Sequence, residues 1–182
     1  GEIGGTVGDI ESLPFLESIR QFSLDVGQEN VLFIHLVLLP YISAAGELKS
    51  KPGQHSVKEL RSIGLFPQII ILRSDREIEP SILNKISLFC NIPKESVFHS
   101  IDCKTIYQLP LSFHQQGVDH RVAELLGIWS SQPKMDDLLQ VVHNFENPLR
   151  EVKIGVVGKY TELVESYKSL DEAMSHGAIA NQ

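Results

Sequence analysis

Two short apolar runs set the strongest constraint on how this chain can fold. Residues 30–39 are apolar and rich in β-branched side chains and end at Pro40, and residues 68–72 form a second such run after Pro67. Runs of this length are typical of strands that are buried on both faces of a parallel sheet. Residues 56–63, between the two runs, carry apolar side chains at helical spacing and predict a helix.

The alternation of strands and helices continues along the chain. A helix is predicted from Pro14, a second from Pro80, a strand over 95–101, and two more helices over 105–115 and 119–126. This order predicts an α/β fold, with a mostly parallel sheet and helices on both of its faces. Ligands of such sheets gather at the carboxyl ends of the strands. Three polar residues are expected to follow predicted strands there: Glu2 (after a strand of which only the tail is present), Arg73 and Asp102.

The pattern changes at residue 130, where a Ser-Ser-Gln-Pro segment interrupts it. We predict one domain over 1–129, an interdomain linker over 130–150 that includes a helix, and the truncated start of a second α/β domain over 151–182. That start consists of a strand over 152–157 and a helix over 167–179. We expect the chain to be part of a longer protein, because the second domain is too short to close a core.

Charge and composition exclude several classes of protein. Hydrophobic residues make up 42% of the chain, and 23 acidic against 16 basic residues give a net charge of −7, which disfavours binding to a nucleic-acid backbone. Apolar runs stay below the ~18 residues of a membrane span, and no secretory signal is recognisable. Cys90 and Cys103 are interpreted as reduced core thiols of a cytoplasmic protein.

Two segments could carry binding chemistry. Residues 1–12 contain four glycines and three carboxylates, and a turn of this kind can present its amides to an anion. Carboxylates fit beside a phosphate if a Mg²⁺ lies between them. Residues 49–54 place two lysines near a glutamine, which suits a triphosphate. Composition alone favours simpler interpretations, a solvated acidic turn and an ordinary solvated loop.

Other motifs point away from common sites. Gly158-Lys159 lacks the spacing of a phosphate-cradling loop and is interpreted as the end of a strand and a turn with a surface lysine. Seven histidines show no spacing that predicts zinc. Neither cysteine has the glycine-flanked surroundings of a glutaminase nucleophile.

Five segments together resemble one enzyme family. EIGGTVGDIESLPF at 2–15 is similar to the signature of CTP synthases, and further similarity follows in KSKPGQHSVKEL at 49–60, RSD at 73–75, KISLFC at 85–90 and VVGKY at 156–160. The resemblance covers nearly the whole chain in the family's order. It implies a P-loop NTPase-like amidoligase domain with its N-terminal part missing, then a linker and the start of a class-I glutamine amidotransferase domain.

The resemblance also implies the ligands and their residues. UTP, and CTP as feedback inhibitor, would bind Asp9, Ile10, Glu11, Lys49, Ser50, Lys51, Pro52, Gly53, Gln54 and Lys85. The ATP adenine would lie near Ile101, Asp102 and Cys103, and Glu2 would bind Mg²⁺ at the ATP phosphates. Family members commonly carry Thr in place of Gly53, so the loop is expected to lose a hydroxyl and gain flexibility here.

The activity implied is ATP-dependent amination of UTP to CTP, through a 4-phosphorylated UTP and with glutamine as the ammonia source. GTP is the implied activator and a homotetramer the implied assembly, with Lys85 reaching UTP from a neighbouring subunit. The phosphate-binding loop is expected before Gly1 and the glutaminase residues after Gln182, so the chain alone should be inactive. Two alternatives stay open: a non-catalytic nucleotide-binding or oligomerisation module, and another ATPase of this fold related to dethiobiotin synthetases.

Overall fold

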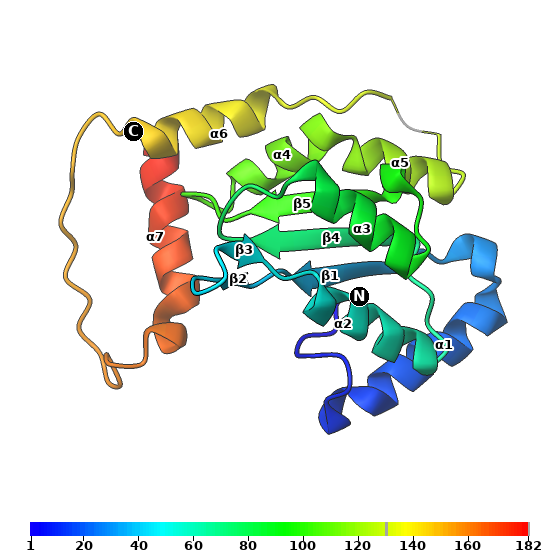
Figure 1. Ribbon diagram of the computed structural model, residues 1–182. Coiled ribbons are helices and arrows are strands. Elements are labelled where there is room, and N and C mark those ends of the chain that lie inside the picture. The colour runs from blue at the N-terminus through cyan, green and yellow to red at the C-terminus, as the bar shows by residue number, and fades with distance from the viewer. Residues whose placement is uncertain (130, 182) are drawn as a thin grey trace. The chain divides into compact units, whose positions relative to one another are not determined.

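The computed structural model of the chain describes residues 1–129 and 131–181. These form two compact units, one of residues 1–104 with 112–131 and the other of residues 105–111 with 132–182. The first unit contains the sheet and the second consists of helices and connecting segments (Figure 1). In the described parts of the chain, no helix has both the length and the apolar character needed to cross a membrane.

A parallel three-stranded sheet organises the first unit. Its strands are β1 (Ile34–Leu38), β4 (Ile69–Ser74) and β5 (Val97–Ile101), in the order β1-β4-β5. Leu36 lies beside Ile71, and Ile71 lies beside Phe98, so these apolar side chains share a face. The predicted α/β fold is therefore confirmed.

Helices cover both faces of this sheet. On one face, α2 (Lys51–Ser62) and α3 (Pro80–Cys90) enclose the larger part of the core. On the other, α4 (Gln108–Gln116) and α5 (Val118–Leu125) cover β4 and β5 (Figure 1). The buried side chains of the larger cluster include Val37, Val57, Ile70, Leu72, Ile86 and Cys90.

The prediction that the first strand is buried on both faces is wrong for one face. Ile34, Leu36 and Leu38 stay exposed, because the helices of that face lie over the other two strands. The strand is also shorter than predicted, since Gln28–Asn30 forms the 3-10 turn η2. Residues 2–3 form no strand in the described structure, so β1 is an edge of the sheet.

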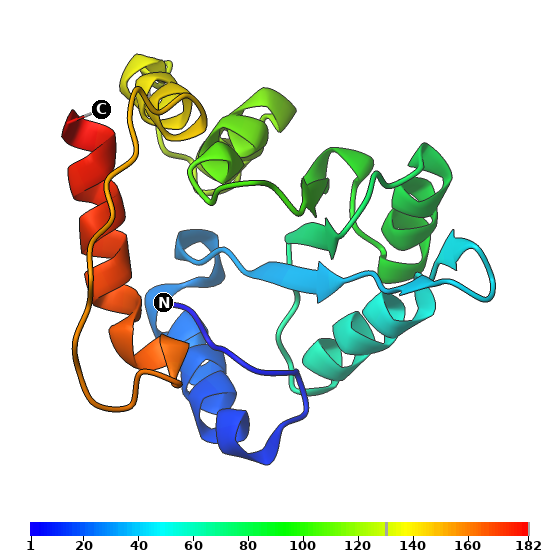
Figure 2. The ribbon, with the colours of Figure 1, turned by 90° about the vertical axis from the view of Figure 1, so that its left-hand side faces the viewer.

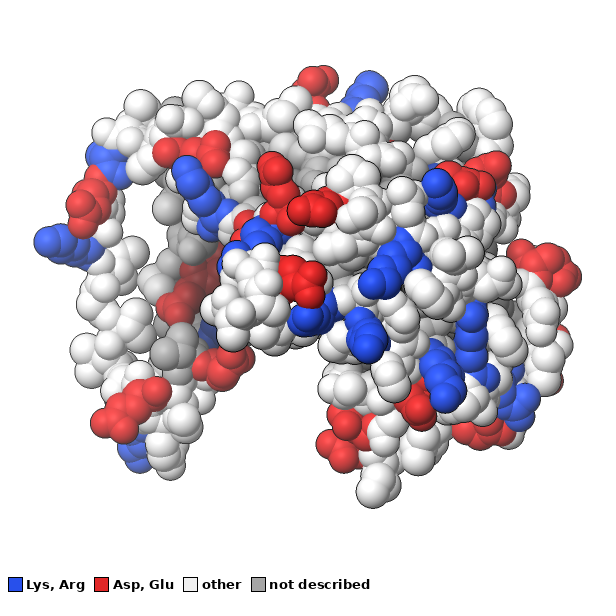
Figure 3. Space-filling model, in the orientation of Figure 1, with Lys and Arg blue, Asp and Glu red and all other residues white. Residues whose placement is uncertain are grey.

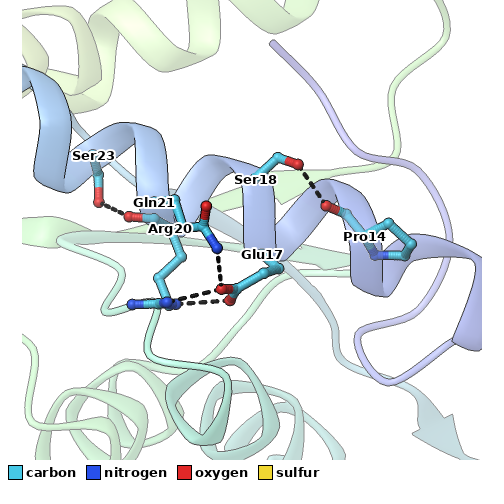
Figure 4. A network of polar contacts seen from close by, with 6 residues as sticks. All are labelled: Pro14, Glu17, Ser18, Arg20, Gln21 and Ser23. Carbon is cyan, nitrogen blue, oxygen red and sulfur yellow. Dashed lines mark hydrogen bonds and ion pairs between the residues drawn. The ribbon is translucent and has the colours of Figure 1, made fainter.

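A bidentate ion pair runs along α1 (Leu13–Val26), which follows the 3-10 turn η1 (Ile10–Ser12). The Nε and Nη2 atoms of Arg20 each donate to the Glu17 carboxylate at 2.8 Å, and the Gln21 amide donates to the same carboxylate (Figure 4). The Arg20 hydrogen bond is the main reason why the pKa of Glu17 falls from 4.5 to about 2. α1 also packs against α2, through Leu16 and Leu60.

Residues 41–54, which precede the helix predicted over 56–63, contain regular structure. β2 (Tyr41–Ile42) and β3 (Glu47–Leu48) form an antiparallel hairpin, and α2 begins at Lys51, five residues earlier than predicted. The prediction missed this because Pro and Gly signalled a break, whereas Pro52 lies in the first helical turn, where proline is favoured. A further 3-10 turn, η3 (Lys94–Ser96), leads into β5.

The second unit is built around α6 (Asp136–Glu146) and α7 (Lys168–Asn181), which follows the 3-10 turn η4 (Val164–Tyr167). Figure 2 shows the long segment that connects α6 to η4. Tyr107 joins the helices, because its hydroxyl donates to Glu172 at 3.1 Å and its ring meets Phe145 edge-on. The helix predicted within residues 130–150 is confirmed, and the helix predicted over 167–179 is confirmed within two residues at each end.

The strand predicted over 152–157 is wrong for the described structure. These residues are exposed and pair with no other strand there, and Val157 is fully exposed. Alternating apolar residues predict a strand only if a neighbouring strand completes the hydrogen bonds, and the described residues of this unit supply none.

We expect Leu72→Ala to lower the free energy of unfolding by about 2–5 kcal/mol, because Leu72 is fully buried in the larger core cluster. Chemical denaturation followed by circular dichroism measures the change. Leu88→Ala is the matched control, since Leu88 is 75% exposed on α3. This substitution should lower the free energy of unfolding far less. Equal losses for the two variants would contradict the described core.

We expect the stability to fall below pH 6.5 because of His35. Burial lowers the pKa of His35, so the unfolded chain binds a proton near pH 6 that the folded chain does not. The contribution is complete above about pH 6.5 and is lost as the pH falls through the lowered pKa. Thermal unfolding of the protein and of His35→Gln between pH 7.5 and 5 should show a smaller pH dependence in the variant. Identical profiles would refute this.

Candidate functional site

The carboxyl ends of β4 and β5 are tied together by an ion pair. The Nε atom of Arg73 donates to Asp102 at 3.0 Å, and the Asp102 amide donates to the Ser74 carbonyl at 2.9 Å. Both charged side chains are about half exposed. Arg73 and Asp102 thus lie where ligands of parallel sheets gather. Ile101 ends β5, and Cys103 is exposed, so its assignment to the core is wrong; Cys90 is buried as predicted.

The glycine-rich start of the chain is a closed turn. The Asp9 carboxylate accepts from the Thr6 amide at 2.8 Å, and the Asp9 amide donates to the Thr6 carbonyl at 3.0 Å. Gly5 has a φ of +86°, in the left-handed region that favours glycine. Asp9 therefore satisfies an amide that we expected to meet an anion, whereas Ile10 and Glu11 stay exposed.

Glu2 is exposed beside this turn. No group of three or more potential metal-binding side chains occurs in the described structure. Mg²⁺ in nucleotide sites is often held by one or two carboxylates together with the phosphates of the substrate. The chain thus offers Glu2 as a single carboxylate ligand, which fits such a shared site but not a metal held by protein alone.

The lysine segment lies at the amino end of α2. Lys49 follows β3, Lys51 is the first helical residue, and no side chain caps the helix at Ser50. The first amides of a helix lack intrahelical partners and attract anions. Gln54 donates to the Ser50 hydroxyl at 3.2 Å and so closes the first turn. Two lysine side chains and a helix start therefore coincide, which is the chemistry of an anion site.

Gly53 is a packing residue, contrary to our expectation of a more flexible loop. It is buried inside α2, and a Cβ at this position would lie 2.5 Å from Cγ1 of Val37. The absence of a side chain lets the helix lie close to β1.

Positive charge gathers over α2 and α3. Figure 3 shows several Lys and Arg side chains on this face. Lys85 is exposed on α3. Glu47 forms an ion pair with Lys49, and this hydrogen bond, with a smaller contribution from Lys85, lowers the pKa of Glu47. The structure therefore brings Lys49 and Lys85 into one electrostatic neighbourhood around Glu47.

The predicted site residues are not all joined. In the described structure, no hydrogen bond or ion pair connects residues 9–11 with residues 49–54, or either segment with Asp102. The structure thus shows three separate candidate segments: the glycine-rich turn, the start of α2, and the carboxyl ends of β4 and β5.

Sequence reasoning missed the hairpin and its support. The guanidinium carbon of Arg76 lies 3.3 Å from the centre of the Tyr41 ring, and Arg76 also makes two hydrogen bonds to Asp75. The sequence did contain a signal for the Glu47–Lys49 ion pair. Glu47 is two residues before Lys49, and this spacing places both side chains on the same side of an extended segment.

Comparison with known proteins assigns the family. Residues 1–128 match the family model described as the CTP synthase N-terminus. The chain belongs to the CTP synthase family. Among its curated relatives, the CTP synthase of Maridesulfovibrio salexigens is 54% identical over 181 residues, that of Geobacter sulfurreducens 55% over 181, and that of Cereibacter sphaeroides 52% over 182.

These alignments cover 99–100% of this chain but only 33–34% of each relative, so the chain spans about a third of their length. The family model ends at residue 128 and describes the N-terminal region as a whole. It does not extend over residues 129–182, where we expected the linker and the start of a glutamine amidotransferase domain. The resemblance to CTP synthases is confirmed.

We expect Gly53→Ala to destabilise the protein by about 1–2 kcal/mol, because the cost of overpacking exceeds the gain in helix propensity. In a Val37→Ala background, the same change should be neutral or stabilising, since the contacted methyl group is absent. Denaturation of the two single variants and the double variant measures the coupling. Additive effects would contradict the close contact between α2 and β1.

Proposed function

We propose that the protein containing this chain makes CTP by ATP-dependent amination of UTP, with glutamine as the ammonia source and a 4-phosphorylated UTP as intermediate. Membership of the family supports this class of carbon-nitrogen ligase in pyrimidine biosynthesis. The single observation that carries the proposal is the coincidence of Lys49, Lys51 and the uncapped start of α2 in the segment that resembles the family's UTP site.

Each of the three candidate segments would bind a different part of the substrates. Lys49, Lys51 and Lys85 would neutralise the UTP triphosphate, and Ser50, Pro52, Gly53 and Gln54 would shape its approach to α2. Asp9, Ile10 and Glu11 would complete the pyrimidine-nucleotide site for UTP and for CTP as feedback inhibitor. Because no hydrogen bond or ion pair joins residues 9–11 to residues 49–54 in the described structure, we propose that these segments meet when copies assemble, as a homotetramer would allow.

The carboxyl ends of β4 and β5 would receive ATP. Ile101, Asp102 and Cys103 would adjoin the adenine, with Arg73 holding Asp102 in place. Glu2 would provide one ligand for Mg²⁺, which, when bound, supplies positive charge to the phosphates during phosphoryl transfer. The other site residues would bind and orient the two nucleotides, because phosphoryl transfer depends mainly on positioning the reactants and stabilising their charge.

Residues 1–129 would be the C-terminal part of the synthetase (amidoligase) domain, 130–150 the linker and 151–182 the start of the glutamine amidotransferase domain. The 182 residues contain no phosphate-cradling loop of the G-x-x-x-x-G-K-[ST] kind. We therefore propose that catalysis, glutamine use and activation by GTP depend on the longer, cytoplasmic protein.

A second function is favoured by one observation. The apolar row of Ile34, Leu36 and Leu38 is uncovered at the edge strand, which suits association. The chain would then act as a nucleotide-binding and oligomerisation module without catalysis.

Calorimetric titration with UTP and with CTP, in the presence of Mg²⁺, tests the nucleotide site. We expect both to bind and Lys51→Ala to weaken binding at least about tenfold, since a charge-assisted contact to phosphate is lost. Lys58→Ala is the matched control, because Lys58 is an exposed lysine further along the same helix. We expect this variant to bind both nucleotides normally. Equal effects of the two variants would contradict a site at the start of α2. CTP formation by the longer protein separates the enzyme from the binding module.

A further inference from the structure

An acidic side chain lies among the lysines that are proposed to hold a triphosphate. Glu47 and Lys49 are two residues apart on the extended segment that ends the hairpin, so their side chains project to the same side and form an ion pair. Lys85 acts on the same carboxylate from α3 and helps to lower its pKa. Neither ion-pair partner is buried, so the pair is open to exchange with dissolved anions.

The hairpin holds Glu47 in this position. Glu47 pairs with Ile42 across the two strands, and the Lys49 amide donates to the Pro40 carbonyl at 2.9 Å, which closes the base of the hairpin. Arg76 covers the Tyr41 ring and so fixes the hairpin to the segment that follows β4. The carboxylate is therefore kept near Lys49 by the backbone as well as by attraction.

We propose that Glu47 competes with the ligand for Lys49: its carboxylate pairs with Lys49 in the free protein, and the phosphate groups of a nucleotide displace it when they bind. This inference rests on the proposed function, because it concerns the same anion site. A phosphate chain carries more charge than one carboxylate and can engage Lys49, Lys51 and Lys85 together, so it competes successfully. Glu47 then lies as a like charge beside the phosphates and limits their affinity.

The opposite role makes the opposite prediction. If Glu47 served only to orient Lys49, its removal would leave Lys49 misplaced and would weaken anion binding. If it is a competitor, its removal frees Lys49 and removes a repulsion. The sign of the change in affinity therefore decides between the two roles.

The experiment is a calorimetric titration of the protein and of Glu47→Gln with inorganic triphosphate and with UTP, at low and at high salt. We expect the variant to bind triphosphate about three- to tenfold more tightly at low salt, with a smaller gain at high salt because salt screens exposed charges. Glu124→Gln is the control for the loss of one negative charge, since Glu124 is 57% exposed and forms an ion pair with Arg121 on α5, away from the lysines of the proposed site.

Each outcome has one meaning. Unchanged or weaker binding of triphosphate by Glu47→Gln, a gain equal to that of Glu124→Gln, or no binding of triphosphate by either protein would overturn the inference. If triphosphate binds more tightly to Glu47→Gln but UTP binds no better than triphosphate, the role of Glu47 stands and the proposed nucleotide site fails.

Discussion

The close contact between α2 and β1 is the interaction on which the candidate site depends. A helix can lie this near a strand only where one of the facing residues has no side chain, and Gly53 meets that condition opposite Val37. The contact lies within the first turn of α2, so it fixes the amino end of the helix rather than its middle. The positions of Lys51 and of the uncapped amides therefore follow from core packing against the buried face of β1, which makes this end of the helix rigid.

Electrostatic balance is the second theme of this surface. The chain carries an overall excess of acidic residues, yet α2 and α3 expose Lys51, Lys58 and Lys85, and Figure 3 shows several basic side chains on this face. Three acidic groups of this unit are paired with a nearby cation: Glu47 with Lys49, Asp75 with Arg76, and Asp102 with Arg73. Such exposed pairs contribute little to stability. In the proposed nucleotide site, the Glu47–Lys49 pair would act on the ligand, because it holds Lys49 in place while leaving it available to a stronger anion.

Sequence reasoning predicted the architecture better than the boundaries. The apolar runs and the helical spacing of residues 56–63 were enough for the parallel sheet and its two helical layers, because burial on both faces leaves a strong pattern. The start of α2 was misplaced because Pro52 and Gly53 look like loop residues, although proline suits a first helical turn and glycine suits a tight contact. The short hairpin left no pattern, since two-residue strands are too short for alternation. Tertiary contacts such as Arg76 over Tyr41 join residues 35 positions apart in the sequence and carry no local signal.

The two failed strand predictions have a common physical cause. Residues 152–157 and the outer face of β1 both carry apolar side chains in patterns that require a covering layer, and the described structure provides none for either. Along β1 the uncovered row ends at Leu38, whose neighbour in register is Arg73 of the Arg73–Asp102 pair. If ATP binds at this end of the sheet as proposed, the apolar row would offer a surface for its flat ring and the charged pair a polar end that orients it. The exposed apolar side chains of β1 thus lie next to the charged pair.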